Sequence, residues 1–150
     1  MGLHGVVAAL AGNAGHQSLA VTLRGLALDE VPGERVGNLL TRELLAGLFT
    51  GTVLGGILVL AVWGLSYAIE GPSLALGIVM GVALIVSMTI GTLTGAVVPL
   101  LLRRFGADPA QGSCIVLIMI TDAIAFGSLL GFTWIALAWL LPGGSGPAVQ

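Results

Sequence analysis

The chain has 150 residues, of which 57% are hydrophobic and 8% are charged, with a net charge of −2 and a mean hydropathy of +1.09. A soluble domain carries about 25% charged residues, so this composition excludes an ordinary water-soluble fold and indicates a surface that contacts lipid. There is no lysine, and the five arginines form no basic patch, which excludes a nucleic-acid partner.

Four continuously apolar stretches predict transmembrane helices, because each is at least as long as the roughly 20 residues that cross the hydrocarbon core. They lie at about 6–28, 44–69, 73–102 and 113–141. Between the first two, residues 34–46 place Arg35, Asn38 and Arg42 on one helical face, which predicts a short amphipathic helix in the membrane interface. We therefore predict an all-α, polytopic helical membrane protein. Its single transmembrane domain covers residues 1–150 and has four transmembrane helices plus this interfacial helix.

The arginines predict the orientation. All five flank the connections after the first and third spans, which lie on one side of the membrane when the chain crosses four times. By the positive-inside rule this side is cytoplasmic, so both termini are expected on the non-cytoplasmic side of the inner (plasma) membrane. Such an N-terminus is hard to insert without a signal sequence, which leads to the hypothesis that one helix precedes this segment in the complete protein.

Glycines recur at four-residue spacing in three of the predicted spans, which places small residues on one helical face and predicts close helix packing. They are Gly47, Gly51 and Gly55, then Gly77 and Gly81, Gly91 and Gly95, and Gly127 and Gly131. The single cysteine, Cys114, is expected to be a small buried residue without a metal-binding role.

One acidic residue, Asp122, falls deep within a predicted span, about nine residues and therefore roughly 13 Å past its cytoplasmic start. A carboxylate at this depth costs at least about 2.5–3.5 kcal/mol unless it is compensated, and such residues are functional by default. No arginine is expected at the same depth, so protonation, a hydrogen bond or a bound cation must compensate the charge. The other acids are expected in loops or at interfaces: Asp29, Glu30, Glu34, Glu43, Glu70 and Asp108.

A polar segment in the first span is predicted to lie at a similar depth to Asp122. It contains Gly12, Asn13, Gly15, His16, Gln17 and Ser18. Polar groups in mid-membrane must face protein or water. One carboxylate with several neutral oxygens suits Mg²⁺ or Ca²⁺ better than zinc or copper. His16 could be a ligand or a proton acceptor, but a packed or water-facing neutral histidine is the preferred expectation. The absence of a nucleophile with a base in the sequence argues against an enzyme.

Two motifs resemble the MgtE family of magnesium channels. One is the segment from Gly12 to Ser18. The other runs from Pro99 to Ala110 and is followed by Ser113 and by Thr121 and Asp122. The resemblance implies a homodimer whose ion path lies between the subunits. It also implies that Asp122 binds hydrated Mg²⁺, and that Ile118, through its carbonyl, and the polar groups of Asn13 and Gln17 line the path. The remaining candidate pore-lining residues are Gly12, Gly15, Ser18 and Thr121. Family members usually have five transmembrane helices and often cytoplasmic sensing domains, so the sequence resembles the last four helices.

The leading hypothesis is passive conduction of Mg²⁺, with Co²⁺, Mn²⁺ or Ca²⁺ as further possible ions. An exchanger of divalent cations coupled to Na⁺ or H⁺ is the nearest alternative. A membrane scaffold subunit that transports nothing, with Asp122 merely hydrogen-bonded, is the alternative from another class.

Overall fold

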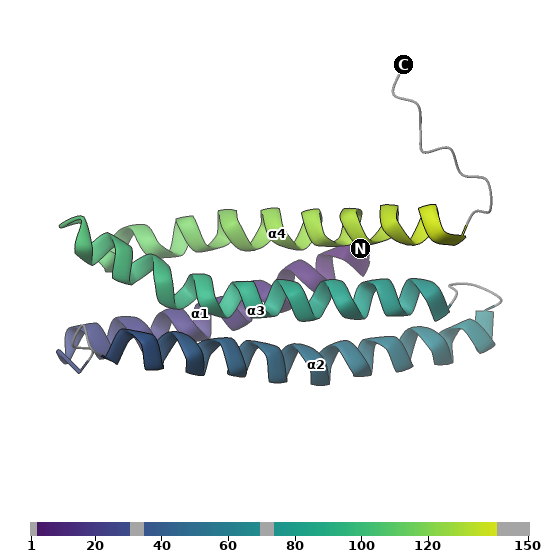
Figure 1. Cartoon of the computed structure of the whole chain (residues 1–150), viewed down its shortest axis with the longest axis horizontal. Helices are drawn as coiled ribbons and strands as arrows, with labels where there is room; N and C mark the ends of the chain where they lie inside the picture. The colour runs from purple at the N-terminus through teal and green to yellow at the C-terminus, as the bar shows by residue number, and fades with distance from the viewer. Residues whose placement is uncertain (1–2, 31–34, 70–73, 141–150) are drawn as a thin grey trace, which may run out of the picture.

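The computed structural model describes residues 3–30, 35–69 and 74–140. In these residues the chain forms four long helices: α1 (Leu3–Ala27), α2 (Val36–Ile69), α3 (Leu74–Arg104) and α4 (Pro109–Leu140). The described part contains no strand, so the prediction of an all-α protein is confirmed. Figure 1 shows the helices running roughly side by side, with α3 between α2 and α4. Helix α3 packs against all three of the others, and α1 also contacts α4.

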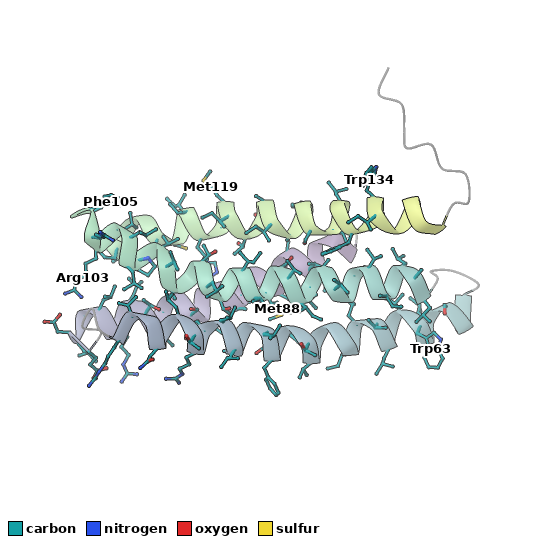
Figure 2. All side chains as sticks on the ribbon, viewed as in Figure 1. Trp63, Met88, Arg103, Phe105, Met119 and Trp134 are labelled. Atoms are coloured by element: carbon teal, nitrogen blue, oxygen red, sulfur yellow. The ribbon has the colours of Figure 1, made fainter. Side chains whose placement is uncertain are left out.

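Three of the described helices contain stretches that are long and apolar enough to cross a membrane. These stretches are Val36–Ser66, Leu74–Arg104 and Gly112–Ile135. Helix α1 has 25 residues, which is long enough to cross, but its polar segment makes it less apolar than the others. Figure 2 shows Trp63 and Trp134 near one end of the bundle and Arg103 at the other. Tryptophans at one end and arginines at the other are typical of a bundle that spans a bilayer.

The segment expected to form a short interfacial helix continues directly into the second span. Residues from Val36 to Ile69 form one continuous helix, so the described part of the segment 34–46 is the beginning of α2. The reason is that this region contains helix-forming leucines and Glu43 but no proline to interrupt it. Residue 34, at the start of the predicted interfacial helix, lies outside the described residues.

Three of the four glycine groups lie in helix contacts, as predicted. Gly51 and Gly55 face α3, and a Cβ atom added to Gly55 would lie 2.9 Å from the carbonyl oxygen of Gly81. Gly91 faces α1, where an added Cβ would lie 2.7 Å from the carbonyl oxygen of Ala11. The fourth group, Gly127 and Gly131, has open space where its side chains would be, so it lies outside the packed core of the chain.

This packing predicts that Gly91→Ala destabilises the bundle. Because the obstructing atom belongs to the α1 backbone, the helices must separate, and overpacking of this kind costs about 1–3 kcal/mol. Gly127→Ala is the matched control, since nothing lies within 4 Å of its added methyl group. Unfolding of both variants in detergent, followed by circular dichroism, should show a lower midpoint for Gly91→Ala alone. Equal midpoints would contradict the proposed contact.

Four of the five arginines lie at one end of the bundle. Arg24 lies in the last turn of α1, Arg103 and Arg104 lie in the last turn of α3, and Arg35 precedes α2. Arg103 donates a hydrogen bond to Asp29 over 2.9 Å, which joins the ends of α1 and α3. Both side chains are solvent-exposed, so this ion pair contributes little to stability.

Candidate cation site

Asp122 lies near the middle of α4, thirteen residues after Pro109, which corresponds to about 20 Å along the helix. Its side chain is exposed in the single chain. The neighbouring positions on the same face are Ile118, Met119 and Phe126, which are 43%, 68% and 46% exposed. Figure 2 shows Met119 pointing away from the other helices. The carboxylate therefore lies on an outward, otherwise apolar face of α4.

No residue of the described part neutralises Asp122. The one ion pair among the described residues joins Arg103 to Asp29. The same part of the chain contains no group of three or more His, Cys, Asp or Glu side chains that could hold a metal. Among the described residues of one chain, Asp122 is therefore a carboxylate at mid-helix without a positive partner.

The polar segment of α1 lies at a similar level to Asp122, as the sequence predicted. Gly91 of α3 lies against both the carbonyl of Ala11 and the side chain of Thr121. Ala11 directly precedes the polar segment of α1, and Thr121 directly precedes Asp122. Since both contact the same residue of α3, the polar segment and Asp122 lie at a similar height along the bundle. Asn13 and Gln17 are both exposed on α1.

Asn13 and Gln17 open into a groove of about 400 Å³ whose lining does not include Asp122. The groove forms because α1 and α2 both pack on α3 but have few contacts with each other. Its polar lining consists of Asn13, Gln17, Ser18, Glu43, Thr50 and Thr92. The amides of Asn13 and Gln17 therefore lie together in one groove. This groove is on the side of α1 that faces α2, and Asp122 does not line it.

The other predicted pore-lining residues have different surroundings. Gly12 has open space around its α-carbon, whereas Gly15 packs against Gly91 and Leu117. The Ser18 hydroxyl donates a hydrogen bond to the carbonyl of Thr92 over 2.8 Å. The Thr121 hydroxyl is buried and donates to the carbonyl of Leu117 over 2.9 Å. In the single chain, Gly15 and Thr121 thus contribute to helix packing, and their place in a pore stays a prediction.

His16 is held by two contacts. Its Nδ1 lies 2.7 Å from the carbonyl of Gly12, and its Nε2 lies 3.3 Å from the sulfur of Cys114. A neutral ring that donates from Nδ1 and accepts the thiol proton at Nε2 satisfies both contacts. The contact with Cys114 packs His16 against α4, which is one of the two surroundings expected for it. The prediction that Cys114 is buried is wrong, because its residue is exposed beside this ring.

Glu43 is the residue that sequence reasoning misplaced. It was predicted at a membrane interface, yet it is 9% exposed and lines the groove from α2. The signal was available in the sequence: Gly47 and Gly51 follow at four-residue intervals and share its helical face. A face that packs closely on α3 buries any acid that it carries.

The apolar, membrane-crossing helices define a helical membrane protein. The carboxylate at mid-helix and the groove lined by neutral oxygens have the chemistry that suits a hard cation. A family model, MgtE, described as a divalent cation transporter, matches residues 5–132. The chain therefore belongs to the MgtE family, and the resemblance seen in the sequence is confirmed.

Three curated relatives are each named magnesium transporter MgtE. The protein of Enterococcus faecalis is 38% identical over 110 residues, covering 72% of this chain and 23% of that protein. The Bacillus subtilis protein is 32% identical over 137 residues, covering 90% of this chain and 28% of its own length. The Thermus thermophilus protein is 35% identical over 99 residues, covering 66% and 21% respectively. The chain thus spans about a quarter of the length of these relatives.

Proposed function

We propose that this chain forms the transmembrane ion path of a magnesium transporter that works as a channel. In this proposal two copies associate, the path lies between them, and Mg²⁺ crosses as a hydrated ion. Family membership and the names of the relatives support divalent-cation transport.

The observation that carries the proposal is the exposed carboxylate of Asp122 on an apolar face at mid-helix. If lipid covered this face, the carboxylate would be desolvated without a partner, at a cost of at least about 2.5–3.5 kcal/mol. If a second copy covered it, Ile118, Met119 and Phe126 would provide an apolar contact. Two Asp122 carboxylates would then share a water-filled passage, and a divalent cation there would neutralise both.

Magnesium suits such a passage because it loses water reluctantly and needs only one or two carboxylates. The ion would keep its hydration shell, and the carboxylates and the Ile118 carbonyl would contact its waters. The driving force would be the membrane potential, which is worth about 2.3 kcal/mol per charge per 100 mV. For a doubly charged ion this is about 4.6 kcal/mol, enough to drive uptake without a coupled ion.

Flux of Mg²⁺ into liposomes that contain the purified chain tests this function. With an imposed potential, negative inside, and no Na⁺ or H⁺ gradient, we expect Mg²⁺ entry that increases with voltage. Entry only when a Na⁺ or H⁺ gradient is present would indicate a coupled exchanger instead. Absence of entry under every condition would contradict the proposed function of the chain as an ion path.

A further inference from the structure

We propose that the groove between α1 and α2 is a second cation site, in which Glu43 binds a hydrated divalent cation within each chain. The proposal rests on the proposed function only for the identity of the ion. It does not require that Asp122 bind one.

The first evidence is the burial of an acid that has no positive partner. Glu43 is 9% exposed, and its main chain is fixed because the Thr92 hydroxyl donates a hydrogen bond to its carbonyl over 3.1 Å. All five arginines lie in the described part of the chain, and none forms an ion pair with Glu43. The carboxylate oxygens of Glu43 are not among the fully buried atoms that have no partner, so they open onto the groove, where a cation would compensate their charge.

The second evidence is the chemistry of the surrounding groove. The amides of Asn13 and Gln17 on α1 and the hydroxyl of Thr50, which is on α2 like Glu43, offer neutral oxygens to the same groove. The described lining has one carboxylate, several neutral oxygens and no imidazole or thiol, and its sulfur is the thioether of Met88. A thioether is a soft ligand, so the oxygens are the ligand set, and they suit a hard cation.

The third evidence is the size of the groove, which is about 400 Å³. Six water molecules occupy roughly 180 Å³ at their volume in the liquid. A hexahydrated ion therefore fits, and its waters can bridge to side chains that are too far apart to bind a bare ion together.

The position of the groove distinguishes it from the Asp122 face. Thr92, which contacts Glu43, and Gly91, which lies against Thr121, are consecutive residues of α3. The two carboxylates therefore lie at similar levels but beside different helices, with Glu43 on the α2 side and Asp122 on α4. A groove ion would be held inside each subunit, whereas an Asp122 ion would be shared between two.

Different stoichiometries follow, and Mn²⁺ can report them by electron paramagnetic resonance on the full chain in lipid nanodiscs. We expect three bound Mn²⁺ per two wild-type chains: one at each groove and one between the Asp122 residues. Glu43→Gln should bind one, and Asp122→Asn should bind two. The exposed acid Glu30 provides the matched control, since Glu30→Gln should still bind three.

The outcomes separate this inference from the proposed function. If Glu43→Gln still binds three Mn²⁺ per two chains, the groove site is wrong even if Asp122→Asn loses one. If Asp122→Asn loses none while Glu43→Gln loses two, the groove site stands and the Asp122 site fails. Should Glu43→Gln lose its helical circular dichroism, Thr50→Arg decides, because it leaves Glu43 in place and adds a competing charge to the groove. Retention of three Mn²⁺ by a folded Thr50→Arg would overturn the inference.

Discussion

Replacing Asp122 with asparagine is expected to lower voltage-driven Mg²⁺ flux at least 100-fold. In the proposed dimer one substitution removes two carboxylates from the path. Interactions with a charged group are worth about 1.5–3 kcal/mol each, so two of them amount to at least about 3 kcal/mol. Asparagine keeps the size and can form hydrogen bonds but has no charge, so the substitution isolates the electrostatic contribution. The measurement is initial Mg²⁺ entry into liposomes at a fixed potential, normalised to reconstituted protein.

Asp108→Asn is the matched control for this substitution. Asp108 is exposed before α4, and its carboxylate accepts a hydrogen bond from the main-chain nitrogen of Ala110 over 2.9 Å. Asparagine caps a helix about as well as aspartate, so this variant should conduct like the wild type. If Asp122→Asn conducts Mg²⁺ as fast as the wild type, the result would favour the scaffold alternative, in which the Asp122 side chain is merely hydrogen-bonded.

Cysteines placed on the outward face of α4 are expected to cross-link two copies of the chain in the membrane. Ile115, Met119 and Phe126 lie on the same face as Asp122 and are 65%, 68% and 46% exposed. If this face meets its symmetry-related copy, residues near the axis approach each other closely, and a disulfide forms where the Cβ atoms come within about 4.5 Å. We expect at least one of the three single-cysteine variants to be mostly dimeric after mild oxidation.

The single native cysteine makes this experiment simple, since Cys114→Ala gives a background without thiols. Ile57→Cys is the control, because Ile57 is 57% exposed but lies on α2. It should remain monomeric on denaturing gels. Efficient cross-linking through Ile57 together with none through the three α4 positions would place the interface on α2 and leave Asp122 outside it.

The helices could be predicted from the sequence because their signal is local. Long apolar runs separated by glycine and proline define α3 and α4, and the starts of the last two helices fall within four residues of the predicted spans. The continuity of α2 was missed because arginines and Asn38 suggested a separate interfacial helix. A helix can leave the apolar core without ending, so a change in polarity alone does not mark its end.

The candidate sites could be predicted only in part. Asp122 could be identified from the sequence because a charge within an apolar run is costly whichever face of the helix carries it. Glu43 was missed because its burial depends on the packing of α2 on α3, which brings it beside Thr92 from a distant part of the sequence. The contact between His16 and Cys114 was missed for the same reason, since these residues are 98 positions apart.

The most direct test of the Asp122 assignment is a crystal structure of the chain in lipid with Mn²⁺, recorded at a wavelength where manganese scatters anomalously. The account predicts an anomalous peak between the Asp122 carboxylates of two copies, at a distance that leaves room for water around the ion. A structure in which Asp122 faces lipid or pairs with an arginine, and in which no peak lies between two copies, would contradict it.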